Sequence, residues 1–504
     1  MRNNNSLGSD SKLLSLFDSL FPIIVLVILL FINVNIYGDA SLDGSNQFIL
    51  IIGAAIAYLF GLKNKVSSST IFSSISSNIK SISIPILILL LVGALSGTWL
   101  LSGIIPSMVY YGFDLINASF FLPICIILSA IVAIATGSSW STTATIGIGL
   151  IGIGKVLGFE SGLVAGAVIS GAYFGDKMSP LSDTTNLAAA VSGSELFSHI
   201  KYMTITTIPT ISITLVFFTL YNLIYQPSEL VSNIEYVESI KDYFYISPVL
   251  FIVPLLVIFL IIKKIHPVVS LFTGVILACL FSALFQNDLI ENLSSSYNIN
   301  SYQVIINSVV NDTNIETNAT LLNDLFSSGG MKGMLNTIWL VIAAMVFGGT
   351  MEAIGALKRI SFFLISSAKS IVGLFSSTIL SCLTVNITAS DQYLSIVIPG
   401  KMFSKAFEDR NLSPVNLSRT IEDSGTVTSV LIPWNTCGAY QSSVLNVNVL
   451  DYFVYAMFNW LSPIMTLFIA AIGYKLKKIN TSNFLDFIPN KNTNTSLNIL
   501  FYYR

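Results

Sequence analysis

Two aspartates, a lysine and a proline stand close together in a stretch that is otherwise apolar. The sequence GDKMSPLSDTTNLA occupies residues 175–188, and Asp176, Lys177 and Asp183 are the only charged residues between positions 162 and 193. A charged side chain at the centre of a bilayer costs about 2.5–3.5 kcal/mol even on insertion scales, so such residues mark ion or substrate pathways. Carboxylates, hydroxyls and carbonyls are hard oxygen donors, which suit hard cations such as Na⁺.

Pro180 lies between the two aspartates and predicts that a helix is interrupted there. A proline inside a helix removes one backbone hydrogen bond and kinks the chain, so carbonyl groups near residues 174–178 would be free to act as ligands. A direct Asp176–Lys177 ion pair is the structural alternative. It also needs a broken helix, because adjacent residues on a helix do not face each other. The expected ligands in this stretch are Asp176, Asp183, Thr184, Thr185 and Asn186.

A second polar stretch, EDSGTVTSVLIPWNTCGAY, lies in the second half of the chain at residues 422–440. Gly425 and Pro433 indicate that it is also unwound. Glu352 ranks lower as a ligand, because near the end of a span it could extend to the membrane surface. The expected ligands are Asp423, Ser424, Asn435 and Thr436, with Asp391 from TASDQY and Ser138 and Ser139 from TGSSW. For these two serines, helix packing is the alternative interpretation.

The chain as a whole has the composition of a protein that crosses the bilayer many times. Of its 504 residues, 53% are hydrophobic and only 10% are charged, which is too few charges to cover a soluble protein of this size. Apolar runs of roughly 20 residues recur along the chain, the length of a membrane-spanning helix. Because these runs are continuous and not alternating, we expect helices and not a β-barrel. The predicted fold class is an all-α polytopic membrane protein with about 11–13 transmembrane segments, broken helices included.

Lysine and arginine residues predict the orientation, because short cytoplasmic loops carry an excess of them. With the spans counted consecutively, the basic clusters at 63–65, 263–264, 358–359 and 475–478 fall on one side, which we expect to be the cytoplasm together with both termini. We predict a single transporter domain over residues 1–504. Its parts are a first repeat with broken helices at 118–225, a polar extracytoplasmic loop at 286–335, a second, inverted repeat at 338–474 and a polar cytoplasmic tail at 479–504.

The motifs GDKMSPLSDTTNLA, EDSGTVTSVLIPWNTCGAY, FGGTMEAIGAL and TASDQY resemble those of the NhaC-type sodium/proton antiporters, and the spacing matches along nearly the whole chain. The resemblance implies a multi-pass antiporter of the bacterial inner membrane, within the larger ion-transporter superfamily. It also implies an elevator-like or rocking cycle of alternating access. Two positions depart from the family pattern: Ser141 replaces a glycine, and Val430 replaces a proline. Both departures bear on hinge geometry.

The predicted mechanism is competition between Na⁺ and H⁺ for the same acids. Asp176, Asp183 and Asp423 are expected to carry protons, and Na⁺ is expected at Asp183 and Asp423. A buried carboxyl group favours its protonated form, whereas a bound cation favours the ionised form. If only occupied sites reorient, exchange is obligatory and no cofactor is needed. Within the first stretch, Asp183 is the expected direct ligand, while Asp176 either holds Lys177 or carries the proton.

The expected partners are Na⁺ and H⁺ as substrates, the lipid bilayer and, as one option, a second copy in a homodimer. A net charge of −2 argues against nucleic acid. Two other functions stay open. An exchanger of small organic acids such as malate or lactate, or of amino acids, coupled to Na⁺ or H⁺, would use the amide-rich breaks around Asn186 and Asn435. An intramembrane aspartyl protease would use paired aspartates, but Tyr173 replaces the first glycine of its G-x-G-D motif. We expect a transporter and not an enzyme.

Overall fold

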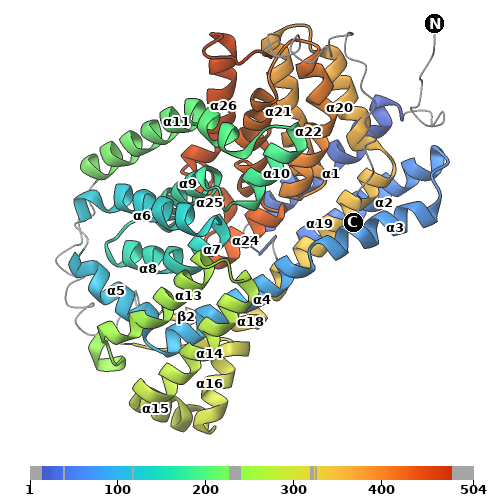
Figure 1. Cartoon of the computed structure of the whole chain (residues 1–504). Coiled ribbons are helices and arrows are strands. Elements are labelled where there is room, and N and C mark those ends of the chain that lie inside the picture. The colour runs from blue at the N-terminus through green and yellow to red at the C-terminus, as the bar shows by residue number, and fades with distance from the viewer. Residues whose placement is uncertain are drawn as a thin grey trace, which may run out of the picture.

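The computed structural model describes residues 14–37, 40–41, 43–115, 118–225, 240–317, 323 and 326–479. Its regular structure is helical apart from a hairpin of β1 (Thr313–Asn314) and β2 (Ser327–Ser328), which pair antiparallel (Figure 1). Within these residues, eight helices are long and apolar enough to cross a membrane, and three shorter apolar helices accompany them. The predicted class, an all-α polytopic membrane protein, is confirmed. The inverted topology of its repeats stays a prediction, and the predicted tail falls outside the described residues except for Ile479.

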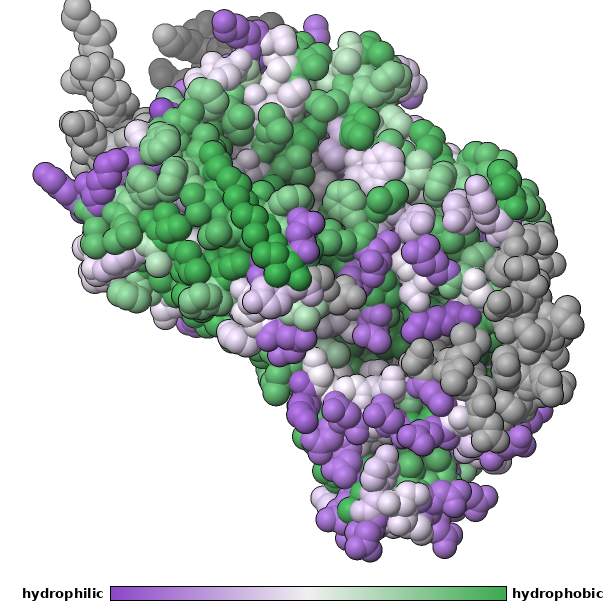
Figure 2. Space-filling view, turned by 180° about the vertical axis from the view of Figure 1, so that it is seen from behind, coloured by the Kyte–Doolittle hydropathy of each residue, from purple (hydrophilic) through white to green (hydrophobic). Residues whose placement is uncertain are grey.

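The outer surface separates into an apolar part and a polar part. Large apolar side chains are exposed on the long and the shorter apolar helices, among them Phe31 at 70% and Leu255 at 63%. Figure 2 shows broad hydrophobic areas over the upper part of the molecule and hydrophilic residues gathered on the projecting lower end. That lower end corresponds to α15 and α16 in Figure 1. Exposed apolar area of this extent is typical of a surface that faces lipid.

The described part of the chain begins with five helices, two of which lie along a helix from the second half of the chain. They are α1 (Leu16–Tyr37), α2 (Ser45–Lys63), α3 (Ser68–Ser81), α4 (Ser83–Leu101) and α5 (Ile104–Leu115). Both α2 and α3 lie along α19 (Leu335–Ala353). α3 begins where the Ser67 hydroxyl accepts a hydrogen bond from the Thr70 N–H, which satisfies a backbone donor of the first turn.

The first interrupted region has two breaks. Its helices are α6 (Phe121–Thr136), α7 (Ser139–Thr142), α8 (Ile148–Val156), α9 (Ser161–Met178), α10 (Asp183–Ser192) and α11 (Leu196–Ile224), with a π-helical turn (Thr143–Gly147) joining α7 to α8. The interruption predicted at Pro180 is confirmed, since α9 ends at Met178 and α10 begins at Asp183. α9 lies against α6 so closely that a Cβ atom at Gly171 or Gly175 would clash with carbonyl oxygens of α6.

The polar middle segment contains helices where its composition indicated only a loop. After η4 (Pro248–Phe251), α13 (Ile252–Ile262) and α14 (Pro267–Phe285), the chain forms α15 (Asn287–Tyr297), α16 (Ser301–Val310), the hairpin and α18 (Gly330–Gly333). The reason is that α15 and α16 are amphipathic. Leu289, Ile290 and Val304 are buried in the core cluster that also contains Trp99 of α4.

The second interrupted region also contains two helix breaks. It comprises α19, α20 (Ala356–Ser367), α21 (Ile371–Thr388), α22 (Gln392–Glu408), α23 (Pro414–Ile421), a π-helical turn (Glu422–Thr426), a 3-10 turn (Ser429–Leu431), α24 (Thr436–Leu445), α25 (Val449–Phe453) and α26 (Met457–Ala471). The breaks α6/α7 and α9/α10 in the first region correspond in order to the breaks at 389–391 and 432–435 in the second. Figure 1 places α7, α9, α10 and α24 near the centre of the molecule.

Candidate ion-binding site

Four helix breaks meet at one place, and each is stabilised by a side chain that caps the following helix. The cap oxygen accepts a hydrogen bond from a backbone N–H of the first turn, which satisfies donors that a helix end leaves unpaired. The capping bonds are Ser141 N to Ser138 Oγ at 3.1 Å, Thr185 N to Ser182 Oγ at 3.4 Å, Leu394 N to Asp391 Oδ1 at 2.8 Å and Cys437 N to Asn435 Oδ1 at 3.0 Å.

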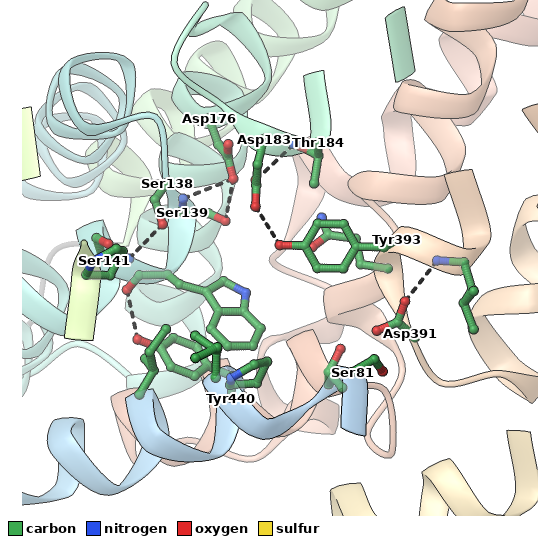
Figure 3. Close-up of a pocket in the computed structure, with 18 of the residues that line it drawn as sticks. Ser81, Ser138, Ser139, Ser141, Asp176, Asp183, Thr184, Asp391, Tyr393 and Tyr440 are labelled. Atoms are coloured by element: carbon green, nitrogen blue, oxygen red, sulfur yellow. Dashed lines mark hydrogen bonds between the residues drawn. The ribbon is translucent and has the colours of Figure 1, made fainter. Parts of the chain in front are cut away.

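A cavity of about 630 Å³ lies where these breaks meet. Its polar lining comes from every break and also from α3 and α19, which close it on the other side. Seven of the residues predicted as ligands line it, namely Ser138, Ser139, Asp176, Asp183, Thr184, Asp391 and Thr436. Figure 3 shows Asp176, Asp183 and Asp391 around this space, with Tyr393 between Asp183 and Asp391. The tertiary structure therefore brings together acids that lie more than 200 positions apart in the chain.

Asp176 is buried and has one free oxygen. Its side chain is 5% exposed, and its Oδ2 accepts hydrogen bonds from Ser139 N at 3.0 Å and from Ser139 Oγ at 2.7 Å. Its Oδ1 has no hydrogen-bond partner among the described residues. Ser182 adds to the polar surroundings of this carboxyl group. A buried acceptor without a partner is costly, so this oxygen is suited to binding a cation or a proton.

Asp183 is exposed at the start of α10, and both of its oxygens are bonded. Its Oδ2 accepts a hydrogen bond from the Tyr393 hydroxyl at 2.5 Å, and its Oδ1 accepts one from Thr184 N at 2.9 Å. The Thr184 hydroxyl donates to Glu422 Oε1 at 3.3 Å and lies 3.1 Å from Ser182 Oγ. Thr184 thus links the first broken segment to the second.

Lys177 pairs with Asp423 and not with Asp176, which corrects the Asp176–Lys177 alternative. Both members of the pair are fully buried. Asp423 Oδ2 accepts two further hydrogen bonds, from the hydroxyls of Thr206 at 2.8 Å and Thr466 at 2.6 Å. Asp423 is not among the residues that line the cavity, and both of its carboxylate oxygens have partners among the described residues. Its predicted role as a Na⁺ ligand stays a prediction.

The other predicted ligands that lie away from the cavity make structural bonds. The Thr185 hydroxyl donates to Lys177 O at 3.0 Å, and the Asn186 amide donates to Pro180 O at 3.0 Å and Ser182 O at 2.6 Å. Ser424 donates to the Thr420 carbonyl, and Asn435 donates to Asn386 O at 3.1 Å. The carbonyl groups freed at Pro180 are therefore partly taken by neighbouring side chains.

Glu422 was not selected as a ligand from the sequence, yet it is a buried acid next to the site. It lies in the π-helical turn, is 0% exposed, and its Oε2 has no hydrogen-bond partner in the described part of the chain. π-helical turns inside helices occur frequently at functional sites. The sequence signal was present, because Glu422 is a second acid directly before Asp423 in an apolar region.

Comparison with known proteins finds a match to the Na⁺/H⁺ antiporter family over residues 171–474. The chain is 34% identical to the Na⁺/H⁺ antiporter NhaC of Alkalihalophilus pseudofirmus, over 85% of this chain and 90% of that protein. It is 32% identical to the malate-2H⁺/Na⁺-lactate antiporter of Bacillus subtilis, over 93% and 97% of the two chains. It is 35% identical to the arginine/ornithine antiporter ArcD of Halobacterium salinarum, over 81% and 82%.

Proposed function

Because this chain belongs to the Na⁺/H⁺ antiporter family, we propose that it is a secondary transporter that exchanges Na⁺ for H⁺ by alternating access. The proposal places it in the bacterial inner membrane with both termini in the cytoplasm. It works as a transporter and not as an enzyme, and it needs no cofactor beyond the transported ions. The observation that carries the proposal is the free, buried oxygen of Asp176 at the wall of the cavity.

Asp176 is the principal Na⁺ ligand in this proposal, with Asp183 as a second carboxylate. The hydroxyls of Ser139 and Thr184 stand beside these acids and provide further oxygen donors of the kind that Na⁺ prefers. This order reverses the expectation that Asp183 is the more direct ligand. The reason is that both Asp183 oxygens already accept hydrogen bonds, whereas Asp176 Oδ1 has no partner among the described residues.

The coupling between Na⁺ and H⁺ transport follows from the free-energy cost of burying an unpaired charge. An ionised carboxylate without a compensating positive charge is unstable in a buried site, so Asp176 holds a proton when Na⁺ is absent. Binding of Na⁺ supplies the compensating charge and displaces the proton. If the empty, ionised site is too costly to move across the membrane, only the protonated and the Na⁺-bound forms reorient, and the exchange is obligatory.

The orientation of the cavity also supports the cycle. His266 lines the cavity and is exposed, and it comes directly after the basic stretch that contains Lys263 and Lys264. The excess of lysine in cytoplasmic loops puts this end of α14 at the cytoplasm. The described conformation then corresponds to the inward-facing state, in which Asp176 exchanges ions with the cell interior.

Proton release on Na⁺ addition tests the proposal directly. Purified protein in weakly buffered detergent solution with a pH indicator should release protons when NaCl is added, and far fewer when choline chloride is added at equal ionic strength. Asp176→Asn should abolish the release, because an amide neither gives up a proton nor compensates a cation. Asp288→Asn, an exposed acid on α15, is the matched control and should behave as the unmodified protein. Normal release from the Asp176 variant would refute the assignment.

A further inference from the structure

The cavity is much larger than Na⁺ requires. Its volume of about 630 Å³ falls in the range of pockets that hold small organic molecules, roughly 300–1,000 Å³. A dehydrated Na⁺ needs only a few oxygen ligands, which Asp176 and its neighbours supply at one end. The remaining space has a polar and aromatic lining of its own, so the cavity has room for a larger cargo.

The charges around the cavity favour a cargo that carries positive charge. The lining contains four acids, which form two acidic pairs: Asp176 with Asp183, and Asp391 with Glu352. Within the part of the chain that the structure describes, no lysine or arginine lines the cavity, and His266 is its only basic lining residue. Two acidic pairs in one concave space attract positive charge and repel an organic anion.

The helix ends around the cavity do not offset this preference. A helix N-terminus attracts anions through its unpaired N–H groups. Here the side chains of Ser138, Ser182, Asp391 and Asn435 already accept hydrogen bonds from first-turn N–H groups. Two acids, Asp391 and Asp183, also lie at the starts of α22 and α10, where their charge cancels the helix dipole. A carboxylate ligand would therefore meet acceptors at these ends.

Aromatic rings line the same space. Trp140 stacks on Tyr440 with their ring centroids 3.9 Å apart, and Tyr440 donates a hydrogen bond to Trp140 O at 3.0 Å, which holds the pair in place. Both rings and Tyr393 line the cavity. An aromatic face attracts an ammonium group and also packs against its alkyl chain. Together with the unpartnered Oδ1 of Asp176, which is 5% exposed, these rings indicate a ligand that is cationic and partly apolar.

We propose that the cavity binds an organic cation with two ammonium groups, of the alkyl diamine class, as an alternative cargo to Na⁺. One ammonium group takes the place of Na⁺ at Asp176 and Asp183, and the other binds at Asp391 and Glu352. The alkyl chain lies against Trp140, which Tyr440 supports from behind, and against Tyr393. The inference rests on the proposed function, since the diamine competes for the acids that exchange Na⁺ for H⁺.

The test is displacement of ²²Na⁺ from the purified full-length protein, with butane-1,4-diamine, n-butylamine and malate as competitors. Butane-1,4-diamine should compete at about tenfold lower concentration than n-butylamine, because its second charge meets the second acidic pair, and tenfold corresponds to about 1.4 kcal/mol. Malate should not compete. Equal potency of the two amines, or displacement by malate alone, would overturn the inference.

The substitution Glu352→Gln tests the second acidic pair, Asp391 and Glu352, independently of the first. Glu352 is partly exposed near the end of α19, and it accepts a hydrogen bond from Asn78 Nδ2 at 2.9 Å that a glutamine oxygen can also accept. The substitution should remove most of the tenfold advantage of the diamine over butylamine. An unchanged ratio in this variant would also overturn the inference. The comparison of the two amines on the unmodified protein needs no variant and stands if Glu352→Gln does not fold.

The outcomes distinguish this inference from the proposed function. If Na⁺ releases protons but the diamine neither displaces ²²Na⁺ nor releases protons, only the diamine inference fails. If the diamine releases protons and Na⁺ does not, Na⁺/H⁺ exchange fails and the diamine inference stands. Transport is then tested by uptake of labelled diamine into proteoliposomes, driven by an outward-directed proton gradient. Binding without any uptake would overturn the role of the diamine as cargo.

Discussion

The acids of the two polar stretches occupy different surroundings. Asp176 and Asp183 stand at a break and line the cavity, whereas Glu422 and Asp423 lie in a π-helical turn and are fully buried. Asp423 forms an ion pair with Lys177, the residue directly after Asp176 in the chain. The difference teaches that the acids of the first region face the cavity, where an ion can reach them, while Asp423 of the second region neutralises a buried cation beside it.

The largest effect should follow from breaking the buried ion pair. Lys177→Met leaves Asp423 as an uncompensated interior charge, and removing one partner of a buried pair costs about 3–5 kcal/mol. We expect most of the folded protein to be lost, as measured by size-exclusion chromatography after a heating series. Lys177→Met combined with Asp423→Asn should recover much of that loss, because the carboxylate that the first change leaves without its ion-pair partner is removed as well.

Lys63→Met is the matched control for this comparison. Lys63 pairs with Asp18 at 2.9 Å, but its side chain is 63% exposed. Exposed pairs contribute about 0–1 kcal/mol, so the control should be nearly as stable as the unmodified protein. A Lys177 variant as stable as the Lys63 variant would contradict a structural role for the Lys177–Asp423 pair.

The double variant also decides the role of Asp423 in transport. If Asp423 is a Na⁺ ligand, as its sequence motif predicts, the double variant should lose Na⁺-dependent proton release. Its contacts favour the role of counter-ion to Lys177, so we expect the folded double variant to keep the release with an apparent Na⁺ affinity within about threefold of normal. The measurement is the pH-indicator assay in detergent. Complete loss of proton release would show that Asp423 is needed for Na⁺ binding.

A smaller effect is expected from the residue that holds Asp176. Ser139→Ala removes the 2.7 Å hydrogen bond from Ser139 Oγ to Asp176 Oδ2 but keeps the bond from the backbone N–H. Because hydrogen bonds to charged groups contribute about 1.5–3 kcal/mol, we expect the apparent Na⁺ affinity to fall by about tenfold or more. Ser77→Ala removes another hydroxyl of the cavity lining, one on α3 with no hydrogen bond to Asp176, and should change the affinity little. Equal effects from the two serines would argue against the positioning of Asp176 by Ser139.

The smallest effect should come from Tyr393→Phe. This change removes the hydroxyl that donates to Asp183 Oδ2 at 2.5 Å. Since Asp183 is exposed, water can replace the lost donor, and we expect a change in apparent Na⁺ affinity of only about two- to threefold. A loss as large as that of Asp176→Asn would show that Asp183, and not Asp176, dominates the site.

Much of the fold follows from local properties of the chain. Apolar runs long enough to cross a bilayer predict the spans, and Pro180 predicts the break before α10 because its ring cannot continue the helical bonding. The helices α15 and α16 were missed, because their polar composition hides a narrow apolar stripe that needs a packing partner on α4.

The sequence by itself determined which chemical groups are placed in the apolar interior, since charge, proline and hydroxyl content can be read directly from GDKMSPLSDTTNLA and EDSGTVTSVLIPWNTCGAY. Only the tertiary structure decided which acid is free. The partner of Lys177 is 246 positions away, and the neighbours of Asp176 come from another break. Whether a carboxylate is paired or open depends on the atoms packed around it, and chains of similar local sequence can pack those atoms in different ways.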